Sequence, residues 1–272
     1  MPTEDAARRL ADCRLGGLSV EPLGADDRPA DLAAAYAIQD RVHGLLAPTR
    51  FGRRIGWKIG CTTRVMQAYL GIDAPCGAGL FEGTRHPSPA RLRASGFRRI
   101  GIECEIALRL GRPLDGAGGV PDLAAVSAAI ESAMPAIEIV DDRYADWRSL
   151  GAPTLIADDF FAAGCVLGDA VPVAALPDLA AVIGVMTING EERGRGVGAD
   201  VLGHPYAALA WLAASLAARG KRLEAGEIVL TGSLVETRWL EPGDSARIAI
   251  DGLGAVDLSL LPPALDQPGA GL

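Results

Sequence analysis

Residues 101–110, GIECEIALRL, have the length and apolar composition of a core strand but carry two carboxylates. Successive side chains of a strand point to opposite faces, so Glu103 and Glu105 share one face, roughly 6.5–7 Å apart. The alternate residues, which are apolar, take the other face and are expected to be buried. Two like charges on one face repel each other unless a cation lies between them. The stretch therefore indicates either a divalent-metal site or a solvated strand face that binds nothing.

A second apolar segment favours the metal site. Residues 134–140, MPAIEIV, are apolar except for Glu138. A lone carboxylate is costly to bury in such a segment unless it is paired or bound to a metal. Glu103, Glu105 and Glu138 are therefore predicted to form a hard oxygen site for Mg²⁺ or Mn²⁺, with open positions for water and a chelating substrate. Zinc fits less well, because none of the three histidines lies near a cysteine at ligand spacing.

Four motifs resemble the fumarylacetoacetate hydrolase superfamily. In chain order they are GWKIGCT (56–62), IECEIALRLGRPL (102–114), PAIEIVDDRYADW (135–147) and GEIVLTGSL (226–234). Within the superfamily, the chain is most similar to the branch of 2-keto-4-pentenoate hydratases and 4-oxalocrotonate decarboxylases. The resemblance implies an α+β fold, in which a mixed β-sheet roll or barrel of the fumarylacetoacetate hydrolase C-terminal type is flanked by helices.

The same resemblance implies a divalent-metal-dependent lyase, either a hydratase or a decarboxylase. Its substrate would be a small 2-keto or 2-hydroxydienoic acid of aromatic-compound catabolism, and the protein would be a homodimer or higher homo-oligomer. Two alternatives stay open. One is a C–C bond hydrolase of acylpyruvate or fumarylacetoacetate type, which needs a Glu–His pair that the sequence does not place together. The other is a non-catalytic member that only binds a keto acid.

Lys58 follows a tryptophan and has apolar neighbours, so its side chain is expected to point into a cleft or to meet an anion. The resemblance to the hydratases implies a catalytic role for it. Thr231 and Gly232 end a predicted strand at 227–233, where a hydroxyl and backbone amides can approach a substrate carboxylate closely. By resemblance, these two residues and Asp158 are predicted to bind the substrate.

The chain departs from the hydratase pattern at two places. Cys76 stands where the hydratases carry an acidic residue, and Phe160-Phe161 stands where they carry paired serines. Both departures predict a more apolar pocket than that of the hydratases. Such a pocket favours a keto acid with a hydrophobic tail, at roughly 0.8 kcal/mol per buried methylene.

Composition sets further limits. The 272 residues are 49% hydrophobic and 22% charged, which is typical of a globular chain with an ample core. We expect a helical N-terminal subdomain at 1–50, a metal-binding catalytic β-roll domain at 51–262 and a frayed tail at 263–272. The net charge of −8 argues against nucleic-acid or anionic-membrane partners. Five cysteines without CxxC spacing indicate reduced thiols of a cytoplasmic protein. No apolar run has the form of a signal peptide or a membrane span.

Local patterns predict the remaining elements. Capping and first-turn acidic residues predict a helix at 3–13, amphipathic periodicity predicts one at 31–46, and an Ala/Leu-rich run predicts one at 205–219. Residues 71–80 are expected to form a glycine-rich loop or lid, and residues 122–134 a helix that Pro135 ends. Residues 160–168 are interpreted as a strand, and 191–200 as a polar return loop after the Asn189-Gly190 turn.

Overall fold

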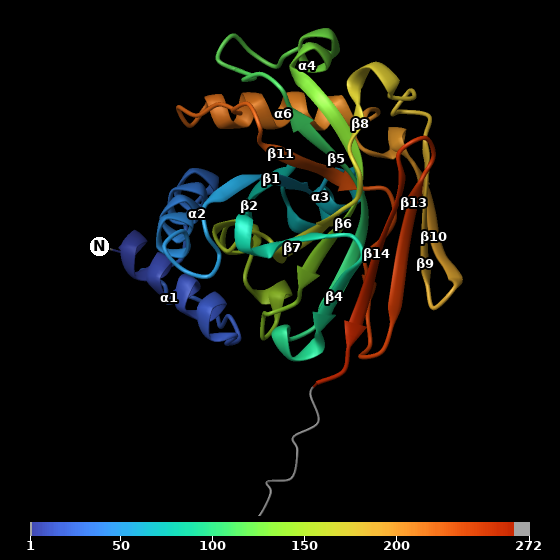
Figure 1. Cartoon of the computed structure of the whole chain (residues 1–272). Coiled ribbons are helices and arrows are strands. Elements are labelled where there is room, and N and C mark those ends of the chain that lie inside the picture. Colours follow the sequence, from blue (N-terminus) through green and yellow to red (C-terminus); the bar gives the residue numbers. More distant parts are fainter. Residues whose placement is uncertain (1, 264–272) are drawn as a thin grey trace, which may run out of the picture.

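Two β-sheets pack against each other, with helices around them, in the computed structural model, which describes residues 2–263 (Figure 1). The larger sheet has nine strands. Their order is β2 (Cys76–Phe81), β1 (Arg54–Gly60), β11 (Ile228–Ser233), β5 (Ile100–Leu110), β6 (Ile130–Asp141), β7 (Ala162–Leu167) and β3 (Arg85–Pro87), with β12 (Arg238–Trp239) beside β5 and β8 (Val171–Pro172) beside β6. The β1–β11 and β3–β7 pairs are parallel and the others are antiparallel, so the sheet is mixed.

The smaller sheet has five strands, in the order β10 (Glu191–Val197), β9 (Ile183–Ile188), β13 (Ser245–Ile250), β14 (Gly254–Leu261) and β4 (Ala90–Arg93). One face of β5 packs toward it. Ile102, Cys104 and Ile106 are fully buried and belong to the same apolar cluster as Met186 and Ile248 of the smaller sheet. The alternation predicted for this strand is confirmed, and it leaves the glutamates on the opposite face.

The helices are α1 (Pro2–Gly16), α2 (Leu32–Leu46), α3 (Arg64–Leu70), α4 (Leu123–Ala129), α5 (Ala152–Ala157) and α6 (Pro205–Ala217). Short 3-10 turns are η1 (Glu82–Thr84), η2 (Ala94–Gly96), η3 (Trp147–Ser149), η4 (Val173–Ala175) and η5 (Gly198–Asp200). In Figure 1 the N-terminal helices and the smaller sheet lie on opposite sides of the larger sheet. Helices α1 and α2 share an apolar cluster with α5, through residues such as Leu10, Val42 and Leu155. None of the helices within residues 2–263 is long and apolar enough to cross a membrane.

The predicted fold class is confirmed, since mixed sheets carry flanking helices. The helices expected at 3–13, 31–46 and 205–219 are present, and Asp31 caps the second by accepting a hydrogen bond from Ala34 N. The Asn189-Gly190 turn is also confirmed, with both residues at positive φ. The tail expected at 263–272 lies outside the described residues beyond Pro263.

Other local predictions were wrong. Residues 76–80 of the supposed loop belong to the buried strand β2, where glycine allows close packing: a Cβ on Gly79 would lie 2.7 Å from the His43 ring. The helix expected at 122–134 ends at Ala129, and Pro135 lies inside β6, opposite Ile106. Here pairing with β5 outweighs helix propensity.

The strand expected at 160–168 is present as β7, and a tight left-handed turn separates it from α5. Residues 191–197 form β10 instead of a loop, because the turn at Asn189-Gly190 returns the chain along β9. A polar sequence is compatible with β10 because the strand lies at the edge of its sheet and is largely exposed.

Candidate active site

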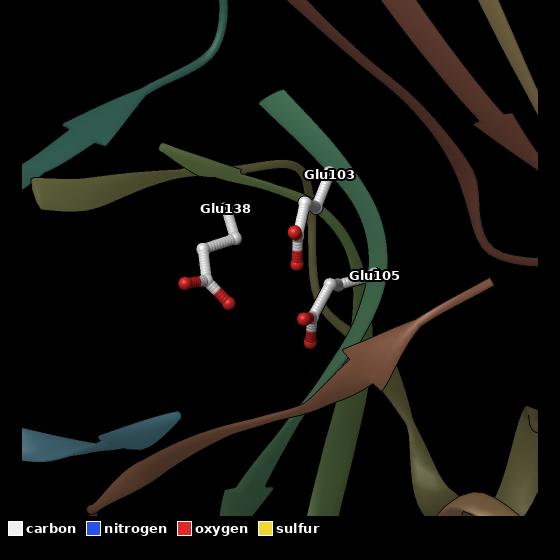
Figure 2. A group of neighbouring side chains, drawn as sticks. All are labelled: Glu103, Glu105 and Glu138. Carbon is white, nitrogen blue, oxygen red and sulfur yellow. The ribbon is translucent and has the colours of Figure 1, made fainter. Parts of the chain in front are cut away.

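Three carboxylates meet on the face of the larger sheet that points away from the smaller one. The antiparallel register of β5 and β6 places Glu103 directly opposite Glu138, and Glu105 lies two residues along the same face. One oxygen from each side chain lies within 4.8 Å of the other two. Figure 2 shows the three side chains converging. The structure thus brings together the three acids that the sequence selected.

This cluster has the properties of a site for a hard divalent cation. Glu105 and Glu138 are buried, and Glu105 Oε1 and Glu138 Oε2 have no hydrogen-bond partner among residues 2–263. Burial, together with the charge of Glu138, raises the pKa of Glu103 to about 7 and holds the pKa of Glu105 well above its usual range. Buried carboxylate oxygens without partners are expensive, and a divalent cation coordinated by them removes that cost. The donor set therefore fits such a cation.

Lys58 lies against this cluster from strand β1. Its Nζ is 3.0 Å from Glu138 Oε1 and donates a 2.8 Å hydrogen bond to the carbonyl oxygen of Phe160. Burial disfavours the charged form, but Glu138 and Glu103 outweigh it, so the pKa of Lys58 is raised above its ordinary value. Lys58 is therefore a fixed ammonium group beside three carboxylates, as its unusual sequence setting suggested.

Gly232 and Thr231 support the cluster from strand β11. The N–H of Gly232 donates a 2.8 Å hydrogen bond to Glu105 Oε2. Only glycine fits there, because φ is +119° and a Cβ would lie 2.5 Å from Cγ2 of Thr62. The Thr231 hydroxyl donates to the carbonyl of Ile106 at 2.9 Å. The two residues thus hold β5 and Glu105 in place. The sequence predicted that they bind the substrate, but neither is among the described residues that line the cavity beside the carboxylates.

Asp158 is likewise kept away from the cavity. Its side chain is fully buried, and its Oδ2 accepts a 2.8 Å hydrogen bond from Nε of Arg143. Arg143 also donates to the backbone carbonyls of Asp158 and Ala162. Asp158 and Arg143 therefore close the turn between α5 and β7. Asp158 holds the backbone, whereas the sequence predicted that it binds the substrate.

A cavity of about 640 Å³ opens beside the carboxylates. The predicted site residues that line it are Lys58 and Glu103, and its wall also includes Phe160 and Phe161. Hydroxyl side chains line it too, namely Thr62, Thr63, Ser233 and Thr237. The Thr237 hydroxyl donates a short hydrogen bond to Glu103 Oε1. This volume is typical of a small-molecule site.

The two departures from the hydratase pattern fare differently. Phe160 and Phe161 line the cavity, as the sequence predicted. Cys76 does not line it. This cysteine is buried in β2 with its sulfur 3.9 Å from that of Cys61, and Cys61 is the cysteine that lines the cavity. An apolar wall is therefore present, and Cys76 does not reach the cavity but packs against Cys61, which does.

Sequence reasoning missed a buried polar network beneath Phe160. Asp159 Oδ2 lies 2.5 Å from Nη1 of Arg14 in α1, and Asp159 Oδ1 lies 2.8 Å from Nε2 of His43 in α2. Gly79 N–H donates to the same Oδ1 at 2.9 Å. Burial alone would raise the pKa of Asp159, but His43 and Arg14 hold it well below its usual range. The aspartate is thus a fixed negative charge that joins both N-terminal helices to the cavity wall.

The network supports an unusual backbone. Asp159, Phe160 and Phe161 have φ values of 59°, 45° and 64°, so three consecutive non-glycine residues are left-handed. Such residues cost of order 1–3 kcal/mol each and persist only where their surroundings hold them. The turn aims the Phe160 carbonyl at Lys58 and both rings at the cavity. No sequence signal announces this turn, because bulky aromatic residues normally avoid positive φ.

The histidines do not supply the base that a C–C hydrolase needs. His43 is engaged by Asp159, and His204 caps α6 by accepting a hydrogen bond from Tyr206 N. His86 lies in the short strand β3. The described residues that line the cavity include no histidine.

Comparisons with known proteins agree with this geometry. A 2-keto-4-pentenoate hydratase of Paraburkholderia xenovorans (strain LB400) is 34% identical over 254 residues, covering 93% of each chain. A 2-hydroxyhexa-2,4-dienoate hydratase of Comamonas testosteroni is 33% identical over 258 residues, covering 94% of this chain and 96% of the relative. Among solved structures, 4-oxalocrotonate decarboxylase from Pseudomonas putida G7, complexed with magnesium and adipate, is 28% identical. It superposes with a TM-score of 0.89 over 95% of this chain and 97% of the other.

The sequence model of the fumarylacetoacetate hydrolase C-terminal region matches residues 83–260, which contain all three clustered glutamates. That match covers well over half of the 272 residues. Together with relatives more than 30% identical over nearly the whole chain, it shows that this chain belongs to the fumarylacetoacetate hydrolase family.

Proposed function

We propose that this protein is a Mg²⁺-dependent lyase that adds water to a small 2-hydroxydienoic acid or its 2-keto isomer. The observation that carries the proposal is the group of three convergent carboxylates with Lys58 fixed against them at the wall of a cavity. A divalent cation and one ammonium would balance three carboxylates, and the open coordination positions of such a cation can take oxygen atoms of a substrate keto acid. The names of the hydratases similar to this chain support the same chemistry.

Glu103, Glu105 and Glu138 would hold the metal, and we propose Mg²⁺ in place of Mn²⁺. When bound, the ion supplies Lewis-acid polarisation of the 2-oxo group. Lys58 contributes through its own charge. Addition of water to carbon 4 of the conjugated keto acid leaves negative charge on the 2-oxo oxygen, and a buried ammonium that is already in place stabilises that charge. The Phe160 carbonyl and Glu138 hold the ammonium, so little reorganisation is needed during the reaction.

Hydration is favoured over decarboxylation by the polar part of the cavity wall. Four hydroxyl side chains line it, and hydroxyls can accept from and donate to a water molecule. Thr237 and Ser233 are themselves fixed, the first to Glu103 and the second to the carbonyl of Val235 at 2.6 Å. A fixed hydroxyl can orient a water, which a decarboxylation does not require. Hydrolysis of a 1,3-diketo acid is the weaker candidate, because no histidine lines the cavity among the described residues.

Purified full-length protein incubated with 2-hydroxypenta-2,4-dienoate tests the proposal. In the presence of Mg²⁺ we expect the dienoate absorbance to disappear and 4-hydroxy-2-oxopentanoate to form, and excess chelator should stop the reaction. Acylpyruvates serve as the comparison substrates. Cleavage of those compounds with no dienoate turnover would make the protein a C–C hydrolase. Binding of keto acids without turnover of either class would make it a non-catalytic member.

A further inference from the structure

A row of aromatic rings begins at the Lys58 ammonium, and three of its members, Phe160, Phe161 and Trp147, line the cavity. Lys58 Nζ lies 5.5 Å from the centre of the Phe160 ring, and the Phe160 and Phe161 rings are 5.5 Å apart. The Phe161 ring lies 5.9 Å from Trp147, whose ring lies 5.6 Å from Tyr69 in α3. Tyr69 is 57% exposed, so the row leads from the buried carboxylate cluster to the surface.

The charges around the cavity are unevenly distributed. Among the described residues that line it, Lys58 is the one cationic side chain, whereas Glu103, Asp200 and Glu236 are acidic. Lys58 lies with the carboxylate cluster, at the start of the aromatic row. A ligand carboxylate placed farther along the row would meet aromatic rings and no cation from the lining.

Two neighbouring arginines are engaged by aromatic rings. Arg148 packs on the ring of Trp147 at 4.6 Å and donates a 3.2 Å hydrogen bond to the Tyr69 hydroxyl. Arg99 lies 4.3 Å from the centre of the Trp239 ring and 3.8 Å from Asp142. Neither arginine lines the cavity. Each arginine is thus already engaged by an aromatic ring and is not part of the cavity lining.

We propose that the site selects a monocarboxylate, a 2-keto or 2-hydroxydienoic acid whose far end is an alkyl or aryl group lying along Phe160, Phe161 and Trp147, and rejects the corresponding dicarboxylate. This inference rests on the proposed function for the head of the molecule and adds the chemistry of its tail. It sets the chain apart from the structurally similar decarboxylase, whose structure holds adipate, a molecule with a carboxylate at each end.

Calorimetric titration with two six-carbon acids in saturating Mg²⁺ tests the proposal. 2-Oxohexanoate and 2-oxoadipate share the keto-acid head and differ in one terminal group, a methyl in the first and a carboxylate in the second. We expect 2-oxohexanoate to bind about tenfold more tightly, and 4-phenyl-2-oxobutanoate at least as tightly as 2-oxohexanoate. Oxalate, which has no tail, is the reference ligand for the head.

A matched pair of substitutions assigns the preference to the aromatic row. Phe161→Leu keeps an apolar side chain and should retain most of the preference. Phe161→Ser introduces a hydroxyl and should bring the ratio of the two dissociation constants close to one, with each constant normalised to oxalate in the same variant. Both substitutions relieve the same ring contacts, so a shared change in melting temperature does not affect the comparison.

The outcomes are distinguishable. If neither oxalate nor any keto acid binds in the presence of Mg²⁺, the proposed function itself fails. If keto acids bind but 2-oxoadipate binds as tightly as 2-oxohexanoate, the tail proposal is overturned. Loss of that dicarboxylate affinity in Arg148→Gln would then assign the second carboxylate to Arg148.

Discussion

The Nζ of Lys58 and the carbonyl oxygen of Phe160 form a 2.8 Å hydrogen bond between residues 102 positions apart in the chain. The same ammonium lies 3.0 Å from Glu138, so it bridges the carboxylate cluster and the left-handed turn that lines the cavity. Removing it should therefore affect chemistry more than folding. In Lys58→Met we expect kcat to fall by about 10² or more, because a charge aimed at the developing oxyanion is lost.

Stability provides the control for this variant. Lys221, the other lysine in the chain, pairs with Asp40 at the surface, so Lys221→Met should leave kcat unchanged. The melting temperature of Lys58→Met should stay near that of the parent protein when Mg²⁺ is bound. A large loss of stability in saturating Mg²⁺, with normal turnover, would make Lys58 a structural residue instead.

Replacing a clustered carboxylate should weaken metal binding. In Glu105→Gln we expect Mg²⁺ affinity to fall by about 100-fold, which corresponds to about 2.8 kcal/mol, because an anionic oxygen ligand is lost. The matched control is Glu131→Gln, an exposed position on the same sheet. Calorimetric Mg²⁺ titration of both variants makes the comparison. Full activity of the parent protein in excess chelator would contradict the metal site altogether.

The pH dependence of stability follows from the raised pKa of Glu103. Without metal, the folded state retains a proton on this group up to about pH 7, whereas the ordinary value is 4.5. Between those values the native state binds more protons than the unfolded state, so the free energy of unfolding should decrease as the pH rises from about 4.5 through 7. Glu105, also raised, acts in the same direction.

Chemical denaturation at pH 5, 6, 7 and 8, with and without Mg²⁺, measures this effect. Glu103→Gln should flatten the metal-free profile, and Mg²⁺ should stabilise the parent protein most at the high-pH end, where the carboxylates are ionised. If the free energy of unfolding of the metal-free protein instead rises steadily over this pH range, other titrating groups dominate the pH dependence.

The Asp159 network should matter for both folding and the site. Asp159→Ala leaves the buried Arg14 without its partner, which typically costs about 3–5 kcal/mol. It also releases the left-handed turn, so we expect a lower kcat through displacement of the Phe160 carbonyl. The double variant Arg14→Met/Asp159→Asn removes both charges and should be less destabilised than Asp159→Ala. Thermal unfolding and kcat are measured for both single variants and for the double variant. Additive losses of stability with unchanged kcat would restrict the network to a structural role.

Oligomeric state remains a prediction from the sequence. We expect a homodimer or a higher homo-oligomer at micromolar concentration. Light scattering gives the mass directly, and a monomeric mass would contradict it.

The sequence predicted those features that follow from the regular alternation of apolar and polar residues along a strand. The alternation around Glu103 and Glu105 sets one face of a strand, and a lone Glu138 in an apolar run identifies its partner strand, so the carboxylate cluster was predictable. The strand β2 was not, because its glycines have the composition of a loop and reveal their packing role only against His43.

Direct contacts were harder to predict than elements. Thr231, Gly232 and Asp158 were chosen for their type and place in a motif, yet their hydrogen bonds go to Ile106, Glu105 and Arg143. Whether a polar group faces a cavity or the protein depends on partners far along the chain. The same holds for Asp159, whose partners in α1 and α2 lie more than 100 residues earlier.

The left-handed turn at 159–161 also bears on how such a protein can change. The carboxylates belong to a sheet whose register fixes their positions, whereas the Phe160 and Phe161 rings, proposed to meet the far end of the substrate, come from a turn outside it. Exchanging these two rings can reshape the cavity without shifting a strand, provided that the backbone of the turn keeps the Phe160 carbonyl on Lys58. If the tail proposal holds, the choice of substrate can therefore diverge at these two side chains while their backbone keeps the reaction centre intact.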